Sequence, residues 1–184
     1  YAFARLRWPF RDQIFAVLMA TLMLPYVITL IPTFLIWSGL GFVDTYVPLI
    51  VPHWLGTNVF YIFLLRQFFK ALPKELDEAA TIDGAHIVQV FWYIVLPLSR
   101  PALLVVAILS GLGAWNDFVD PLVYINSSEK YTVALGLSQF VGLYTSQWSL
   151  LMAAATVVII PVIIVFFFTQ RYFMTSITMT GLKG

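Results

Sequence analysis

Four long apolar runs divide this sequence, and a more polar segment separates each from the next. Residues 14–36, 47–65 and 150–169 contain no Asp, Glu, Lys or Arg, and residues 98–119 contain only Arg100 and Asp117, near their ends. A helix rises about 1.5 Å per residue, so about 20 apolar residues cross a hydrocarbon core about 30 Å thick. The pattern therefore predicts an all-α fold, a polytopic bundle of about four transmembrane helices at these positions.

Three of the four predicted spans contain a proline well inside them, and Pro101 lies near the start of the third span. The first span contains Pro25 and Pro32, the second contains Pro52, and the fourth contains Pro161. A proline cannot donate a backbone hydrogen bond, but in a bundle the neighbouring helices can satisfy the carbonyl group that it leaves free. We therefore expect Pro25 and Pro32 to kink the first span rather than to end it.

The Lys and Arg residues lie almost entirely on one side of the predicted spans. Cytoplasmic loops of membrane proteins carry an excess of these residues. Lys130 alone lies on one side, and nine lie on the other: Arg5, Arg7, Arg11, Arg66, Lys70, Lys74, Arg100, Arg171 and Lys183. The bias predicts that the N-terminal segment, the loop at residues 66–100 and the C-terminal tail are cytoplasmic, and that residues 38–46 and 120–149 are external.

Composition agrees with a membrane protein and excludes several other classes. Of the 184 residues, 61% are hydrophobic and 10% are charged, whereas a soluble domain carries about 25% charged residues. A formal net charge of +1 gives no indication of nucleic-acid binding. The sequence has no Cys, so disulfides and Cys-ligated metals are excluded, and no other metal-ligating pattern is present.

The cytoplasmic segment at residues 70–97 has the pattern of an amphipathic helix from Leu72 to Asp83. At about 100° per residue, one arc carries Leu72, Leu76, Ala79, Ala80 and Ile82, and the opposite arc carries Lys74, Asp77, Glu78 and Thr81. Pro73 suits a first helical turn, and Gly84 is typical of the position just after a helix. A second helical stretch from Ile87 to Val95 is expected before Pro97.

Two interpretations of this helix differ in what covers its apolar arc. A helix on the lipid surface favours large apolar residues on one face and Lys or Arg on the other. Here the apolar arc includes Ala79 and Ala80, and the opposite arc is mainly acidic. Small residues allow another backbone to come close, so we favour a helix that docks in a groove of a partner protein. A lipid-surface helix is the alternative.

This segment resembles the EAA signature of the permease subunits of ABC importers. Every fixed position of that signature is met. It begins with Glu78-Ala79-Ala80, continues after three residues with Gly84, and ends after nine more with Ile94-Val95-Leu96-Pro97. Residues 64–69, 72–85, 113–118 and 170–184 are similar to its carbohydrate-uptake branch, in particular to the second permease subunit of maltose-type and glycerol-phosphate-type importers. The resemblance covers essentially the whole chain.

The resemblance implies transport without bond chemistry in the permease itself. Family members have six spans, so we expect this chain to lack the first and most of the second, with residues 1–5 at the end of the latter. Two homologous permease subunits pair in the inner membrane of a prokaryote. Each presents a coupling helix to one subunit of an ATP-binding dimer, and an external solute-binding protein delivers the substrate. ATP and Mg bind to the partner ATPase, and no catalytic site, metal or cofactor is expected here.

The resemblance also implies roles for individual residues. Glu78 is expected to anchor the ATPase, with a helix-dipole charge as the alternative, and Ala79 and Ala80 are close-contact positions. Gly84 permits a turn that other residues would strain. Asp83 is expected to cap or brace that turn, and Pro97 closes the signature. The tail at residues 178–184 resembles an extension that reaches toward the ATPase, with a frayed end as the alternative.

Candidates for a substrate path are Trp115, Asn116, Asp117 and Tyr124. Intramembrane polar residues usually face a cavity or one another, and aromatic rings stack on sugars. However, Trp and Tyr also form ordinary interfacial belts, so structural roles are favoured. His53, the only histidine in the second span, is expected to be a packing residue.

Two rival classes of function fit the sequence less well. An intramembrane enzyme would show H-E-x-x-H or G-x-S-x-G, which are absent, or two carboxylates on separate helices, whereas Asp117 and Asp120 lie in one segment. An ion-coupled carrier or channel would need ionisable residues near the span centres, which have none. The expected function is therefore import of a sugar or related solute, and the sequence does not specify the solute.

Overall fold

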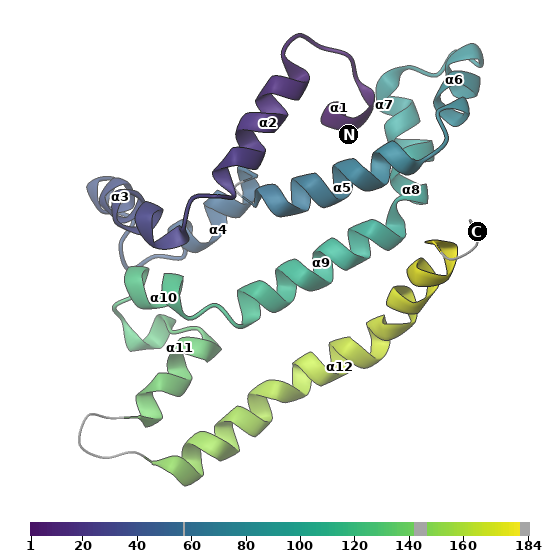
Figure 1. The fold of residues 1–184 in the computed structure, drawn as a ribbon. Helices are drawn as coiled ribbons and strands as arrows, with labels where there is room; N and C mark the ends of the chain where they lie inside the picture. Colours follow the sequence, from purple (N-terminus) through teal and green to yellow (C-terminus); the bar gives the residue numbers. More distant parts are fainter. Residues whose placement is uncertain (57, 142–146, 181–184) are drawn as a thin grey trace. The chain divides into compact units, whose positions relative to one another are not determined.

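The computed structural model describes residues 1–56, 58–141 and 147–180, and the side chains of all of these except 171–180. The described residues form helices and connections without a β-strand (Figure 1), which confirms the all-α prediction. The α-helices are α1 (Ala2–Arg5), α2 (Arg11–Thr21), α3 (Tyr26–Gly39), α4 (Val47–Trp54), α5 (Val59–Ala71), α6 (Glu75–Ile82), α7 (Ile87–Val90), α8 (Leu96–Leu98), α9 (Arg100–Trp115), α10 (Val119–Tyr124), α11 (Val133–Leu137) and α12 (Trp148–Thr180). A π-helix, η1 (Phe91–Val95), follows α7, and the short 3-10 helices are η2 (Ser128–Lys130) and η3 (Ser138–Phe140).

Two helical stretches of the described chain are long and apolar enough to cross a membrane. These are Val47–Ala71, which includes α4 and α5, and Trp148–Gln170 within α12. Two broken pairs qualify as well if each pair is one crossing, namely α2 with α3 and the segment Ile87–Leu98 with α9. Length and composition of the described residues therefore allow up to four crossings.

The prolines act differently from one span to another. The first apolar run is interrupted after Thr21, and its helix resumes at Tyr26 with Pro25 extended just before it. The expectation that Pro25 only kinks a continuous helix is therefore wrong, because proline there starts a new helix that needs no donor at this position. By contrast, Pro32 lies inside α3, and α12 continues through Pro161 as one long helix (Figure 1).

The second predicted span is also interrupted, but a glycine rather than its proline lies at the break. Pro52 lies inside α4, which ends at Trp54, and α5 begins at Val59. Gly56 lies in this connection with φ +75°, a conformation that L-residues with side chains rarely adopt. The absence of charged residues predicts one continuous span here, but Gly56 and Asn58 are residues typical of turns, and they lie at the break.

The chain divides into two compact units. Unit 1 is formed by the described parts of Tyr1–Leu24, Asn58–Ala107 and Thr178–Gly184, so it contains α1, α2, α5 to α8 with η1, the first half of α9 and the last residues of α12. Unit 2 is formed by the described parts of Pro25–Thr57 and Ile108–Ile177. The predicted cytoplasmic segment at residues 70–97 therefore lies wholly in unit 1, and the candidate substrate-path residues lie in unit 2.

The core of unit 1 lies between α5 and the segment that follows it. Phe69, Ala80, Val90 and Val95 form a buried cluster. The ring of Tyr1 closes one side of it, with its centroid 5.0 Å from that of Phe91 and 6.3 Å from that of Phe69. This cluster joins α1, α5, α6, α7 and η1 into one body, since each of these elements supplies at least one member or a partly buried neighbour.

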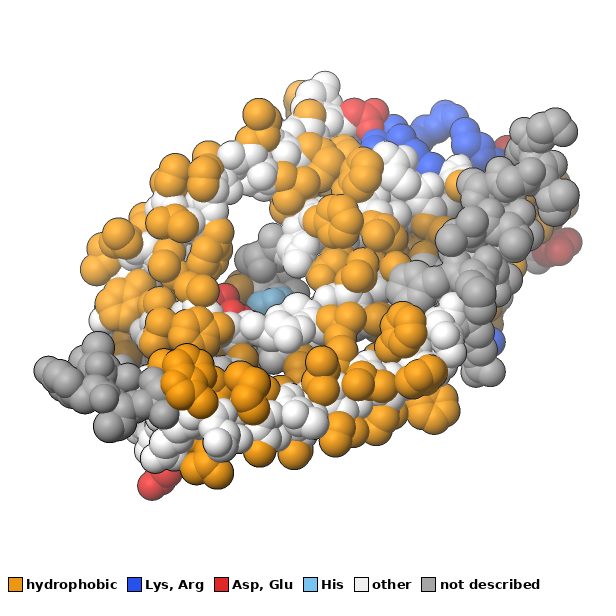
Figure 2. Space-filling view, turned by 60° about the horizontal axis from the view of Figure 1, so that its bottom comes forward, with side chains coloured by type: hydrophobic (Ala, Val, Ile, Leu, Met, Phe, Trp, Pro, Cys, Tyr) orange, Lys and Arg blue, Asp and Glu red, His pale blue; other side chains and the backbone are white. Residues whose placement is uncertain are grey.

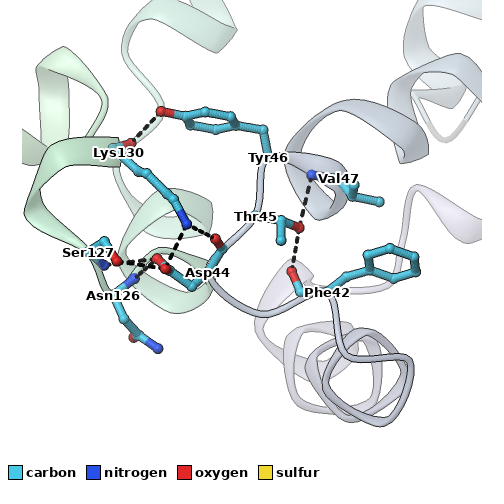
Figure 3. A network of polar contacts seen from close by, with 8 residues as sticks. All are labelled: Phe42, Asp44, Thr45, Tyr46, Val47, Asn126, Ser127 and Lys130. Atoms are coloured by element: carbon cyan, nitrogen blue, oxygen red, sulfur yellow. Dashed lines mark hydrogen bonds and ion pairs between the residues drawn. The ribbon is translucent and has the colours of Figure 1, made fainter.

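Unit 2 is held together at one end by the side chain of Asp44. Figure 3 shows the carboxylate of Asp44 facing Asn126, Ser127 and Lys130. One carboxylate oxygen accepts hydrogen bonds from the backbone amides of Asn126 (3.0 Å) and Ser127 (2.8 Å), and the other lies 2.8 Å from Lys130 Nζ. Asp44 itself has φ +60°, so these contacts hold an unfavourable backbone conformation. The connection before α4 is thereby fixed to the segment after α10.

Candidate functional site

The helix at the centre of the predicted signature, α6, begins later than its sequence pattern indicates. It starts at Glu75, whereas the pattern placed the start at Leu72. Leu72 is extended, with ψ 143°, because the ring of the following Pro73 disfavours the helical region for the residue before it. Glu75, Asp77 and Glu78 therefore all lie in the first turn, where negative charge interacts favourably with the helix dipole.

A left-handed glycine ends α6 and turns the chain toward α7. Gly84 has φ +85°. Its amide donates to the Thr81 carbonyl (3.0 Å), and the amide of Ala85 donates to the Ala80 carbonyl (2.9 Å). This pair of hydrogen bonds is the Schellman motif, which satisfies carbonyl groups that a helix end leaves free. Asp83 is the C-cap residue, and its exposed side chain has no hydrogen bond to the described residues.

The residues of the EAA signature are divided between the interior and the surface of unit 1. Ala80 is buried in the core cluster, and Ala79 and Glu78 are exposed. Ile82 was predicted to share the apolar arc with Ala80, but its side chain is 86% exposed. The helix therefore uses a narrow strip around Ala80 for packing within the unit. It leaves Glu78, Ala79 and Ile82 accessible.

Asp77 lies in a different environment from the one its sequence position predicts. The pattern placed it on the outer arc, whereas the structure shows it partly buried, with its carboxylate 3.4 Å from Arg5 Nη1. Arg5 also donates a hydrogen bond of 2.7 Å from Nη2 to the Leu72 carbonyl. A single guanidinium group from α1 thus holds both the entry to α6 and the first turn of α6.

A second arginine fixes α1 and α2 to α5. Arg66 donates from Nε to the Phe3 carbonyl (3.0 Å) and from Nη2 to Asp12 (3.1 Å), and its guanidinium lies 3.8 Å from the centre of the Phe15 ring. Asp12 also pairs with Arg11, at 2.9 Å. From the sequence, Arg66 is predicted only to be one of the cytoplasmic charges. An arginine within a helical apolar run could have indicated a buried partner.

The end of the signature forms a bend. The π-helix η1 ends two residues before Pro97, and the backbone amide of Leu96 donates to the carbonyl of Phe91, five residues earlier. Proline cannot take part in the regular ladder, and a π turn is one way to accommodate it. Ser99, which is fully buried, donates from Oγ to the Val95 carbonyl (2.6 Å). Directly after it, α9 departs at 73° from the segment Ile87–Leu98.

The candidate substrate-path residues do not form one common surface within unit 2. Trp115 and Asn116 lie at the exposed end of α9, and Asn116 donates its side-chain amide to the Leu112 carbonyl (2.8 Å). Asp117 is partly buried and accepts a hydrogen bond from the backbone amide of Asp120 (3.3 Å). Tyr124 is 3% exposed, and its ring lies 6.0 Å from that of Phe34. A packed tyrosine of this kind offers little surface to a solute.

Two further features of the described chain bear on function. His53, which was expected to pack inside the second span, is exposed within α4. No group of three or more His, Asp or Glu side chains that could hold a metal occurs among the described residues. Residues 181–184 of the predicted C-terminal extension lie outside the described part of the chain.

Comparison with known proteins gives consistent matches along the chain. The family model described as "Binding-protein-dependent transport system inner membrane component" matches residues 1–178. The arabinooligosaccharides transport system permease protein AraQ of Halalkalibacterium halodurans is 37% identical over 184 residues, which is 100% of this chain and 65% of that protein. The sn-glycerol-3-phosphate transport system permease protein UgpE of Yersinia enterocolitica is 34% identical over 179 residues, covering 96% of this chain and 63% of that protein. The osmoprotective compounds uptake permease protein GgtD of Synechocystis sp. is 36% identical over 100% of this chain and 62% of its own length. The chain thus spans less than two thirds of the length of each of these relatives.

Proposed function

Because the chain belongs to the family of binding-protein-dependent transport system inner membrane components, we propose that it serves in the permease subunit of an ABC importer. In this role it carries a sugar or related solute across the cytoplasmic membrane. Relatives named for arabinooligosaccharides and for sn-glycerol-3-phosphate support this class of solute without choosing within it. The permease performs no bond chemistry, and ATP with Mg is hydrolysed on a partner.

The partners follow from this role. The permease pairs with a second, homologous permease subunit, and an external binding protein delivers the solute. A dimer of ATP-binding subunits docks on the cytoplasmic side, which is the side of residues 66–100 according to the distribution of Lys and Arg. Glu78, Ala79, Asp83 and Gly84 lie at the contact with the ATPase, Ala80 supports it from within, and Pro97 lies at the bend that follows.

One observation carries this assignment of the contact. Ile82 is 86% exposed at the end of a helix whose opposite side is buried and clamped by Arg5. A single exposed isoleucine is ordinary, but this one adjoins Ala79 and Glu78, so an apolar, close-packing surface with one charge faces outward. An isoleucine that becomes buried at an interface contributes about 1.5–3 kcal/mol.

The contact can be tested in the full-length permease, purified with its partner ATPase and companion permease. We expect Ile82→Asp and Glu78→Ala to weaken co-purification of the ATPase and to lower ATP hydrolysis stimulated by the binding protein. For Ile82→Asp we expect the affinity for the ATPase to fall about tenfold or more, because a charge replaces an apolar side chain that the proposed interface buries.

Val133→Asp provides a matched control, because it also places a carboxylate at an exposed apolar position but lies in α11 of unit 2. This control should assemble normally. If Ile82→Asp and Glu78→Ala leave both assembly and stimulated hydrolysis unchanged, α6 is not the coupling element and the proposal is wrong.

A further inference from the structure

Unit 1 contains a cleft of about 750 Å³ that is unusually rich in cationic side chains. It lies where the connection between α1 and α2 faces α5 and α6. Its charged lining residues are five basic and three acidic ones: Arg5, Arg7, Arg11, Lys70, Lys74, Asp12, Asp77 and Glu78. Figure 2 shows Lys and Arg side chains gathered in one area, whereas hydrophobic side chains cover much of the remaining surface in that view.

The three acidic side chains of this cleft are too few to neutralise its five cations, and the exposed Glu78 forms no ion pair among the described residues. Asp12 is shared by Arg11 and Arg66, and Asp77 lies against Arg5. Arg7, Lys70 and Lys74 have no carboxylate within 4.0 Å among the described residues. Three cationic side chains from three separate segments therefore face one cleft without an ion-pair partner, which is a favourable arrangement for a multivalent anion.

The side chain of Arg5 provides an independent indication that this cleft can hold an anion. Its side chain is only 5% exposed, yet Nε and Nη1 have no hydrogen-bond acceptor among the described residues, and only Nη2 is satisfied, by the Leu72 carbonyl. A buried charge that is incompletely hydrogen-bonded is costly. An anion in the adjoining cleft would offset this cost through its charge. A small displacement of the Asp77 carboxylate would expose the guanidinium to it directly.

The surroundings of the cleft indicate which kind of anion it takes. Trp8 and Phe10 line it together with the cations, and Phe10 is largely exposed. From there the apolar side chains of α2, including the exposed Ile14 and Val17, continue into the first predicted span. A phosphate group and a long apolar chain are thus accommodated side by side, which is the chemistry of a phospholipid at the membrane interface.

We propose that this cleft binds the phosphate headgroup of an anionic phospholipid, with Arg7, Lys70 and Lys74 as its primary contacts and α2 along its acyl chains. The inference goes beyond the proposed transport function. The lipid is placed in the cytoplasmic leaflet because of the proposed orientation of the chain, whereas the proposed binding itself does not depend on that orientation. A lipid bound here would lie against the same α1 segment that clamps α6 through Arg5.

The test uses the full-length transporter complex, stripped of lipid in detergent and supplied with phosphatidylglycerol or phosphatidylcholine, with bound lipid counted by native mass spectrometry. We expect selective retention of phosphatidylglycerol. The double variant Lys70→Gln/Lys74→Gln should bind it about 20- to 30-fold more weakly, because one basic residue near an anionic lipid contributes about a factor of five. Arg100→Gln also removes one cytoplasmic charge, but Arg100 does not line the cleft, so it should retain the lipid.

A second measurement separates a lipid headgroup from a soluble phosphate. Phosphatidylglycerol should raise the melting temperature of the complex, and inorganic phosphate at equal concentration should not. Equal retention of both lipids in all variants would overturn the proposal. Stabilisation by inorganic phosphate alone would overturn the assignment to a lipid. Because neither readout requires ATP hydrolysis or transport, failure here is distinguishable from failure of the proposed coupling role.

Discussion

The guanidinium group of Arg5 lies 3.4 Å from the carboxylate of Asp77 and donates a hydrogen bond to the Leu72 carbonyl. Arg5 belongs to α1, a helix of only four residues. Helices this short have no stability of their own. The proposed coupling helix α6 and the short α1 therefore depend on one another, and a force applied to α6 reaches α1, α2 and α5 through Arg5 and the Arg66 contacts.

Replacing Arg5 by Lys should weaken this connection while keeping the charge. Lysine has a compact ammonium group and cannot bind the Leu72 carbonyl and the Asp77 carboxylate in the same planar geometry. We expect a loss of about 1.5–3 kcal/mol in the free energy of unfolding, measured by thermal unfolding of the purified complex. We also expect fewer solute molecules transported per ATP hydrolysed. Arg100→Lys, at an exposed position outside this contact, should change neither quantity, and equal behaviour of the two variants would contradict the clamp.

Replacing Gly84 by Ala tests the turn after α6. Apart from the chain neighbours of Gly84, no atom of the described residues lies within 4 Å of the position that the new Cβ would take, so the loss of stability arises from the backbone alone. With φ +85°, that loss is about 1–2 kcal/mol. Gly39→Ala, at the end of α3 where φ is not positive and space is equally open, should be neutral or slightly stabilising. Equal melting temperatures of the two variants would show that the turn adapts without strain.

The Asp44 network should make one end of unit 2 sensitive to acid. Hydrogen bonds from Lys130, Ser127 and Asn126 hold the pKa of Asp44 well below its ordinary value of 3.8. Since the folded pKa is depressed, the stabilisation is complete above the ordinary pKa and is lost as the pH falls below it toward the depressed value. Amide hydrogen exchange at Asn126 and Ser127, corrected for its intrinsic pH dependence, should therefore accelerate below about pH 4.

Asp44→Asn supplies the reference for that experiment. It removes the titrating group, so exchange at Asn126 and Ser127 should be faster by about five- to tenfold at neutral pH and should show no further acid-induced step. A step of the same size in the variant would mean that another group causes the acid sensitivity.

Ser99 tests the bend between α8 and α9. Ser99→Ala removes the hydrogen bond from Oγ, but the Val95 carbonyl still accepts a hydrogen bond of 3.0 Å from the backbone amide of residue 99. We therefore expect the free energy of unfolding to fall by only about 0.5–1.5 kcal/mol. Ser99→Val adds volume at a fully buried position and should cost about 1–3 kcal/mol. The melting temperatures of the two variants are compared by thermal unfolding. A lower melting temperature for Ser99→Ala than for Ser99→Val would contradict this account.

Much of the local structure of this chain follows from its sequence. The apolar runs predict helices that can cross a membrane, and the spacing from Glu78 to Pro97 indicates the family that the comparisons bear out. Helix ends were predicted less well. Pro25 and Pro73 both lie outside the helices in which they were placed, because proline suits the start of a helix as well as a kink within one.

Only the tertiary structure decided which polar residues act together. Helical periodicity assigns Asp77 and Ile82 to opposite arcs of α6, but it cannot tell which arc finds a partner in the rest of the chain. In the fold, Arg5 draws Asp77 inward, whereas the described residues of unit 1 leave Ile82 86% exposed. The pairs Arg66 with Asp12 and Lys130 with Asp44 join segments far apart in sequence, and no local pattern marks them. The sequence thus determined the helices and their apolar character through short-range periodicity, while long-range packing selected the few charges that hold the helices in place.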